Sequence, residues 1–290
     1  MTKFSARRRS WRWPQNQKIA VSIGLAFEAF ELQSQYKVRD TPGKPNQLSL
    51  SYAEYGANVG GWRLLDLLDS YGLKCHISTN GLAAERHPEF LSTAVEEGHE
   101  IVGHGWVNDR TFTSEDIDAE RADISKTTEA IVAATGKQPL GWASPGASPT
   151  ANTLRLLSEQ NYVWCGDDAS DDVPFVRQVP GGRSMVVLPQ TNAQHNDVQI
   201  YLAPRNAPSI IWEGFRDSFD QLYAEGNDGN PGWTEILIHC HIGGRPILIP
   251  TLKKCFDHIK RHEGVWCATR SEIARWSAAL ADDDAIKSSD

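Results

Sequence analysis

A histidine stands where a buried strand is predicted to end, in the stretch 100–109, which reads EIVGHGWVND. Ile101 and Val102 supply the apolar run, and His104 follows it between two glycines. A histidine in such a place can bind a ligand, hold a metal ion or move a proton. A metal-binding histidine would be expected to have a partner four residues on, but position 108 is Asn. The chemistry of His104 therefore has to be worked out without that partner.

Other acid–base side chains also follow predicted strands. The run Ile19–Phe27 is apolar throughout, which is typical of a strand buried on both faces of a parallel sheet. Parallel α/β folds gather reactive groups on the loops after the C-terminal ends of their strands. The polar residues expected at that rim are Glu28, Glu31, His104, Asn108, Ser144, Asp167, Asp168, Asp171, Asp172, His239 and His241. Carboxylates and histidines suit amide hydrolysis, which needs a base for water and an acid for the leaving nitrogen.

His76 lies within a predicted strand, and two interpretations of it stay open. A lone histidine in a strand is more often a core residue with satisfied hydrogen bonds than a ligand. Its register with Ser78 also allows it to point into a barrel interior, close to His104. His99 precedes the third strand and therefore falls on the rim away from the predicted chemistry.

Strands and helices alternate six or seven times along the chain. Strands are predicted at 19–27, 73–79, 100–102, 162–165, 185–188, 235–239 and 264–267, with a short one near Gly141. Helices are predicted at 60–71, 88–97, 114–135, 152–160, 209–225, 250–262 and 271–280. The polar residues 33–50 read as a long loop. This alternation predicts an α/β fold with a parallel sheet or barrel.

The composition limits the partners and the compartment. The chain has 290 residues and a net charge of −8, which argues against nucleic acid or an anionic membrane as the main partner. No run approaches the ~18 apolar residues of a membrane span, and no apolar segment follows Arg7–Arg9. The five cysteines are scattered and form no CxxC pair, so buried reduced thiols are expected. A cytoplasmic protein is predicted.

The length fits one catalytic domain over 1–290. Its core is predicted at about 18–276, preceded by an arm over 1–17 in which Trp11 and Trp13 act as anchors. A flexible acidic tail is predicted over 281–290.

Several stretches resemble one known family. The segments 74–81 (KCHISTNG) and 97–106 (EGHEIVGHGW) are similar to the second signature block of polysaccharide deacetylases, which have a NodB-like domain. The stretches similar to its allantoinase-like and cyclic-imidase-like branch are Glu54–Gly56, Gly61–Leu65, Gly141–Trp142, Ser144–Pro145, Asp168–Pro174, Leu188–Pro189, Asn196–Asp197, Leu237–His239, Gly244–Pro246, Gly264–Trp266, Arg270 and Ile273–Trp276. The resemblance runs from about Lys18 to Trp276 and implies a distorted (β/α) barrel of about seven parallel strands.

The resemblance also implies roles for individual residues. Metal-dependent members carry a catalytic Asp and a metal-binding Asp after the first strand, two histidines four residues apart, and a C-terminal histidine that acts as an acid. The matching positions here are Glu28 for the base, Ala29 or Phe30 for the metal Asp, His104 and Asn108 for the histidine pair, and His239 for the acid; Ala143 replaces a common arginine. Because Ala and Phe cannot donate to a metal and Asn donates poorly, we expect no metal ion, although zinc or another divalent metal stays an alternative.

The leading hypothesis is a hydrolase of non-peptide C–N bonds that opens a small cyclic amide, imide or ureide. Glu28 would orient or deprotonate water, His239 would protonate the leaving nitrogen or stabilise the oxyanion, and His104 would polarise the carbonyl or hold the water. The residues expected to bind the small-molecule substrate are Glu54, Trp62, Trp106, Trp142, Ser144, Asp168 and His76. The branch also implies a homo-oligomer.

Two alternatives stay open. One is a zinc-dependent deacetylase that acts on an N-acetylated sugar or small molecule. The other is a catalytically inactive relative that binds a ligand, for which the lost metal ligands are the motive. The joint presence of Glu28, His104 and His239 argues against inactivity.

Overall fold

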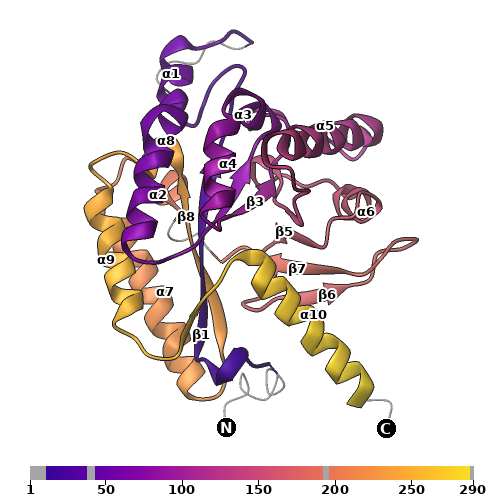
Figure 1. The fold of residues 1–290 in the computed structure, drawn as a ribbon, viewed down its shortest axis with the longest axis vertical. Coiled ribbons are helices and arrows are strands. Elements are labelled where there is room, and N and C mark those ends of the chain that lie inside the picture. Colours follow the sequence, from indigo (N-terminus) through magenta and orange to yellow (C-terminus); the bar gives the residue numbers. More distant parts are fainter. Residues whose placement is uncertain (1–10, 38–42, 192–195, 288–290) are drawn as a thin grey trace.

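A computed structural model describes residues 11–37, 43–191 and 196–287, and it shows a curled, mostly parallel sheet (Figure 1). The nine strands in this part of the chain follow the order β6-β7-β5-β4-β3-β2-β1-β8, and β9 pairs with β1. Their bounds are β1 Ile19–Phe27, β2 His76–Thr79, β3 Glu100–Gly103, β4 Gly141–Trp142, β5 Trp164–Asp168, β6 Phe175–Arg177, β7 Met185–Pro189, β8 Gly232–His239 and β9 Val265–Cys267. Only β6 runs antiparallel to its neighbour, β7.

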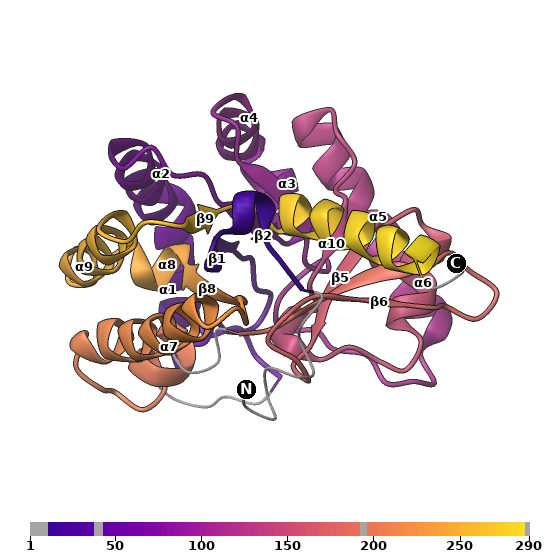
Figure 2. The same ribbon diagram turned by 90° about the horizontal axis from the view of Figure 1, so that it is seen from below.

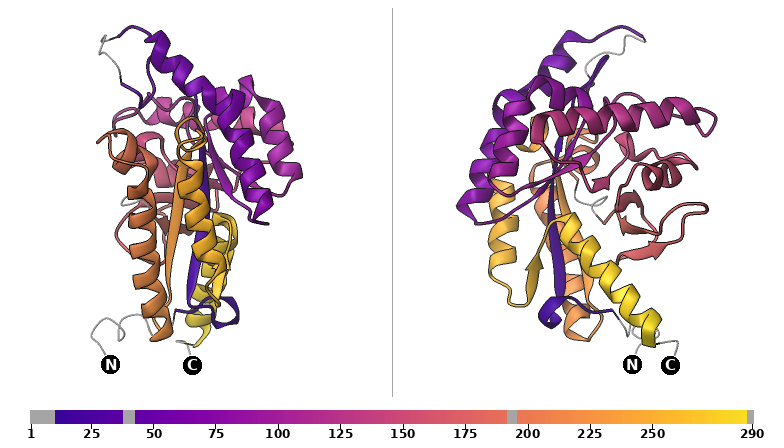
Figure 3. Two further views of the ribbon diagram at one scale, coloured as in Figure 1. Left: turned by 90° about the vertical axis from the view of Figure 1, so that its left-hand side faces the viewer. Right: turned by 45° about the vertical axis from the view of Figure 1, so that its right-hand side comes forward.

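Helices cover the outside of the curled sheet (Figure 2). Their bounds are α1 Gln47–Tyr55, α2 Gly61–Ser70, α3 Gly81–Arg86, α4 Pro88–Glu96, α5 Ile117–Thr135, α6 Thr153–Glu159, α7 Ser209–Asn227, α8 Cys240–Gly243, α9 Ile249–Lys260 and α10 Arg270–Lys287. Short helical turns occur at Pro14–Asn16, Gly56–Gly60, Pro145–Ala147 and Asp197–Leu202. Figure 3 shows α7 and α9 running alongside β8 and β1. None of the helices in the described ranges has the length and apolar character of a membrane span.

Strand β1 pairs with more strands than any other strand in the described sheet. All nine of its residues are buried, and it pairs in parallel with β2, β8 and β9. Its apolar side chains enter cores on both faces of the sheet. The predicted α/β class is therefore confirmed, as are the predicted strands. The described sheet differs from a closed barrel because β6 and β8 each pair with only one neighbour.

Four elements differ from the sequence-based expectation. Helix α1 begins inside the segment predicted as a loop and continues beyond it, and the Asn46 side chain caps it by accepting from the Ser49 amide at 3.1 Å. The short helices α3 and α8 were not predicted. Strand β6 was not predicted either, because its three residues are half-buried or exposed and form no apolar run.

The two ends of the chain are more structured than expected. The Trp13 side chain of the predicted arm is buried, and its Nε1 donates to the Gly232 carbonyl at 2.9 Å. Helix α10 continues to Lys287, through most of the segment predicted as a tail. Residues 1–10 and 288–290 lie outside the described ranges.

A buried ion pair joins β8 to α10 below the C-terminal ends of the strands. Glu235 accepts from Arg270 Nε at 2.7 Å and from Arg270 Nη2 at 2.6 Å. The Ser22 hydroxyl donates to the same carboxylate at 3.0 Å, and His76 Nε2 lies 3.2 Å from it. Because both charges are almost fully buried, each depends on the other.

We predict that Arg270→Met lowers the free energy of unfolding by about 3–5 kcal/mol, because it leaves the Glu235 carboxylate buried without its cation. The double variant Arg270→Met/Glu235→Gln should recover most of the loss, since it removes both charges. Urea unfolding of the three proteins measures this. A loss below about 1 kcal/mol in the single variant would contradict the assignment.

Candidate active site

The Glu28 carboxylate lies directly after β1 and is buried between two imidazoles. Its Oε1 is 3.4 Å from Nε2 of His104 and 3.6 Å from Nε2 of His239, and only 2% of its side chain is exposed. The Gln35 amide donates to Oε2 at 2.8 Å, and Gln35 Oε1 meets Nε2 of His241 at 3.0 Å. The three residues expected to be catalytic are thus brought together at the C-terminal ends of their strands.

His239 is the last residue of β8 and is held by a second carboxylate. Asp197 Oδ1 is 2.6 Å from its Nδ1, and Asp197 Oδ2 accepts from its backbone amide at 2.9 Å. Asp197 itself is fully buried at the start of the turn Asp197–Leu202. These two hydrogen bonds fix the imidazole so that Nε2 faces Glu28.

The carboxylates and imidazoles reinforce one another's charge. Burial alone would lower the pKa of His239, but the negative charges of Glu28 and Asp197 raise it to about 9. Burial alone would raise the pKa of Glu28, but His239 and His104 lower it to about 2. The site at neutral pH therefore holds an anionic Glu28 beside a cationic His239.

His104 is fixed by backbone and side-chain bonds. Its Nδ1 is 2.6 Å from the Ala143 carbonyl oxygen, which can only accept, so Nδ1 carries a proton. The Asn80 amide donates to the His104 carbonyl and its Oδ1 accepts from the Ala29 amide at 3.0 Å. Gly105 turns the chain at φ +66°, where a side chain would be strained. The Nδ1 proton is thus committed to the Ala143 carbonyl, and Nε2 is the ring nitrogen that faces Glu28.

A cavity of about 260 Å³ opens beside this cluster. Glu28, His104, His239 and Ser144 line it together with a set of amide side chains. Those amides are Gln35, Asn108, Gln190, Asn196 and Gln199. The Asn108 Oδ1 atom is buried and has no hydrogen-bond partner. Such a lining offers paired donors and acceptors to a small polar molecule.

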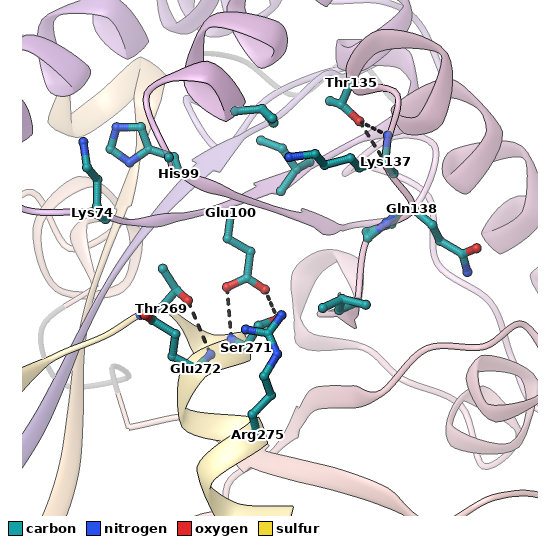
Figure 4. A pocket seen from close by; sticks show the side chains of 15 residues that line it. Lys74, His99, Glu100, Thr135, Lys137, Gln138, Thr269, Ser271, Glu272 and Arg275 are labelled. Carbon is teal, nitrogen blue, oxygen red and sulfur yellow. Dashed lines mark hydrogen bonds between the residues drawn. The ribbon is translucent and has the colours of Figure 1, made fainter. Parts of the chain in front are cut away.

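A larger hollow of about 380 Å³ lies at the other end of the strands (Figure 4). Lys74, His99, Glu100 and Arg275 are among its lining residues, and the Glu100 carboxylate is occupied by the Ser271 amide at 3.0 Å and by the Ser271 hydroxyl. Its one buried carboxylate therefore anchors the start of α10. We place the candidate site in the smaller cavity, because acid–base groups converge there.

Most residues expected to bind substrate lie elsewhere, and Ser144 is the one that lines the cavity. Trp62 packs edge-on against Phe90, at 5.2 Å between ring centroids. Trp106 lies under the Lys126 ammonium, and Trp142 is buried against Tyr162. These indoles face helices, and none of the three lines the cavity.

Glu54 is also misplaced by the prediction. It lies on α1 with 44% of its side chain exposed, 3.5 Å from Arg86 and 3.6 Å from His87. On α1 it pairs with these two side chains and does not line the cavity.

His76 and Asp168 do not line the cavity, and residues one or two positions away take the places expected for them. Ser78 lines the cavity and His76 shares its face of β2, but His76 lies two residues deeper, against Glu235. Burial lowers the pKa of His76 to about 3, so it is a neutral core residue. The pairing of β5 with β7 shifts in register before Asp168, and Asp168 accepts from Ser170 and Arg177. The neighbouring Asp167 instead accepts from the Ser144 amide and hydroxyl, both at 2.7 Å.

Asp197 and Gln35 are site residues that the sequence analysis did not assign. Asp197 follows no predicted strand and was therefore not expected among the strand-end residues. Its only signal was the Asn196–Asp197 match to the allantoinase-like branch. Gln35 lies in a polar segment without periodicity, and nothing in the sequence singled it out.

Two comparisons decide the family. A family model described as polysaccharide deacetylase matches residues 45–164. A Schizosaccharomyces pombe protein named "Putative polysaccharide deacetylase" is 32% identical over 302 residues, which cover 92% of each chain. The chain belongs to the polysaccharide deacetylase family. Membership identifies it as a hydrolase of carbon–nitrogen bonds other than peptide bonds.

Other members of the family carry different names. A Helicobacter pylori protein named "Peptidoglycan deacetylase" is 26% identical over 89% of this chain and 95% of its own. The crystal structure of Puue allantoinase is 30% identical, covers 92% of both chains and superposes with a TM-score of 0.82. This likeness to a solved structure confirms the NodB-like fold, with small differences in strand count.

The residues present do not fit the metal site that the resemblance implies for metal-dependent members of the family. Ala29 uses only its backbone, which accepts from the Asn108 amide at 2.9 Å and donates to Asn80. Within the described ranges, the one trio of His, Cys, Asp or Glu ligand atoms lying within 4.8 Å of one another is elsewhere, at Asp220, His258 and His262. Glu28, His104 and His239 are therefore too widely spread to match such a site.

We predict that NMR titration will give His239 a pKa near 9, and that Asp197→Asn will lower this pKa because one of the two supporting charges is removed. Since the folded-state pKa is raised above its ordinary 6.5, this charge stabilises the fold fully below about pH 6.5 and loses its effect as the pH rises through about 9. The missing signal in His239→Asn assigns the resonance. A value at or below 6.5 would contradict the ion pair.

Proposed function

We propose that the enzyme opens a small cyclic amide, imide or ureide by acid–base hydrolysis, without a bound metal ion. The observation that carries this proposal is the Glu28 carboxylate, 3.4 and 3.6 Å from two imidazole nitrogens at the edge of a small cavity. The set supplies acceptors for water and a charged donor for a leaving nitrogen. Both are needed because an amide nitrogen leaves poorly without a proton.

Water is held between Glu28 and His104 in this mechanism. In this mechanism His104 acts in its neutral form with the proton on Nδ1, so Nε2 and Glu28 Oε1 both accept and the two hydrogens of one water can point at them. The water oxygen is then free to attack the carbonyl carbon, and the Glu28–His104 pair takes the released proton. Holding water suits this tautomer of His104 better than polarising the carbonyl, which needs a donor.

His239 supplies the acid. Its raised pKa keeps it protonated at neutral pH, and Nε2 faces the cavity side of Glu28. When the tetrahedral intermediate collapses, the Nε2 proton passes to the ring nitrogen and the C–N bond breaks. Asp197 holds the ring in place and stabilises the positive charge until that moment.

The cavity supports a compact substrate rather than a polymer chain. Its volume of about 260 Å³ is small, and the amides Asn108, Gln190 and Gln199 at its wall carry both carbonyl and N–H groups. A flat ring with alternating N–H and C=O groups can pair with such amides. The likeness to a structure named allantoinase points to the same class of substrate.

We predict ring opening when the purified chain is screened against allantoin, hydantoin, succinimide and N-acetylated amines. Glu28→Gln and His239→Asn should each lower kcat by about 10²–10⁴-fold, because each removes a group that moves or positions a proton. His87→Gln is the matched control, since this histidine also lies beside carboxylates but outside the cavity. Binding without turnover of any compound would instead support the inactive relative.

The second candidate is a zinc-dependent deacetylase, which the names of the Schizosaccharomyces pombe and Helicobacter pylori relatives favour. We predict that activity survives dialysis against a strong chelator and does not rise when zinc is returned, because the donors at Ala29 and Asn108 are missing. Loss of kcat on chelation with recovery on added zinc would establish the deacetylase mechanism.

We also propose a cytoplasmic homo-oligomer whose main partner is the small-molecule substrate. All five cysteines are free thiols, and four of them are buried, which suits a reducing compartment. Oligomerisation rests on the resemblance to the allantoinase-like branch and stays a prediction.

A further inference from the structure

We infer that Asp220, His258 and His262 form a binding site for a divalent transition metal, with Zn²⁺ as its natural occupant. The three side chains offer ligand atoms that all lie within 4.8 Å of one another. Asp220 comes from α7, whereas His258 lies on α9 and His262 just beyond its end. The two helices pack side by side in Figures 1 and 3. None of the three residues lines the cavity that holds Glu28.

The spacing of the ligands suits one ion. Residues four apart on a helix lie one above the other, and the rings of His258 and His262 are 4.5 Å apart between centroids. Asp220 Oδ1 approaches from the neighbouring helix and is 2.6 Å from Nε2 of His258. The set is therefore two imidazoles from α9 and the turn that follows it and a carboxylate from α7, the donor types that Zn²⁺ takes.

The free nitrogen of His262 is already set for binding. Its Nδ1 is 2.8 Å from the His258 carbonyl oxygen, which must accept, so Nδ1 carries the proton and Nε2 carries the lone pair. Metal-bound histidines commonly donate their second N–H to a carbonyl in this way, because the bond fixes the tautomer and the ring.

Aromatic side chains hold both imidazoles. Phe219 contacts each ring, with 5.0 Å between centroids in both cases. Tyr223 lies 4.9 Å from His262, and Trp212 lies 5.2 Å from His258. Asp220 keeps half of its side chain exposed and His258 only 14%. The nitrogen ligands are thus preorganised, while water can reach the ion and complete its coordination.

Binding would exchange a proton for the metal. The hydrogen bond between His258 and Asp220 would be replaced by two metal–ligand bonds of about 2.0–2.1 Å, which places the nitrogen and oxygen about 3.3 Å apart at a tetrahedral angle. The half-exposed Asp220 side chain can move enough to lengthen this nitrogen–oxygen distance from 2.6 Å to about 3.3 Å. An N₂O donor set favours Zn²⁺, Ni²⁺ or Cu²⁺ over Mg²⁺ and Ca²⁺, which prefer oxygen ligands. The bound ion would clamp α7 to α9.

The test is calorimetric titration of ZnCl₂ into the chelator-treated full-length chain, with thermal unfolding in parallel. Wild-type protein should bind Zn²⁺ and its Tm should rise with metal concentration. His262→Gln and Asp220→Asn should weaken binding at least 10-fold and abolish the rise, while both variants keep the wild-type circular dichroism spectrum. His87→Gln should behave like the wild type.

The active site serves as the second control. The variant His104→Asn should bind Zn²⁺ as the wild type does, because this site does not depend on the proposed reaction. Zinc binding lost in His104→Asn but kept in His262→Gln would overturn the inference and would move the metal to the active site. Absence of binding in the wild type, or equal affinity in the wild type and His262→Gln, would also overturn it.

Discussion

The buried negative charge of Glu28 is the constraint around which the site is built. A carboxylate with 2% of its side chain exposed needs cationic or hydrogen-bonding partners, since an isolated buried charge is very costly. Its partners come from separate elements: His104 after β3, His239 at the end of β8 and Gln35 in the segment after β1. They meet because β1 lies between β8 and β2 in the curled sheet, with β3 the next strand beyond β2. The position of one strand therefore determines where the chemistry can take place.

Two ionic layers lie at different depths along the same strands. In the parallel register of β1 with β8, Ser22 is opposite Glu235 and Ala26 is opposite His239. These pairs are four residues apart, or about 13 Å along a strand. The lower layer, Glu235 with Arg270, is almost fully buried and serves stability, with Arg270 also lining the cavity. The upper layer opens into the cavity. Depth along a strand thus separates a structural charge from a reactive one.

The sequence predicted the strands and the meeting of Glu28, His104 and His239, because apolar runs and strand ends are local signals. It could not predict which face of a helix an indole covers, so the tryptophans were misplaced. Because of the register shift in β5, Asp167 rather than Asp168 bonds to Ser144 beside the cavity, and no local sequence pattern marks such a shift. Asp197 reaches His239 across 42 positions of sequence, a contact that exists only after the chain has folded.

Asn80 bonds to the backbone of Ala29 and so links two loops of the site. One amide side chain is bonded to the loop after Glu28 and to the loop that carries His104. These two reacting groups are therefore parts of a single rigid wall. Gln190 and Gln199 on the other walls have long side chains with several rotatable bonds. Relatives that share the fixed wall can thus acquire new substrates by exchanging these glutamines, while the positions of the proton-transferring atoms stay the same.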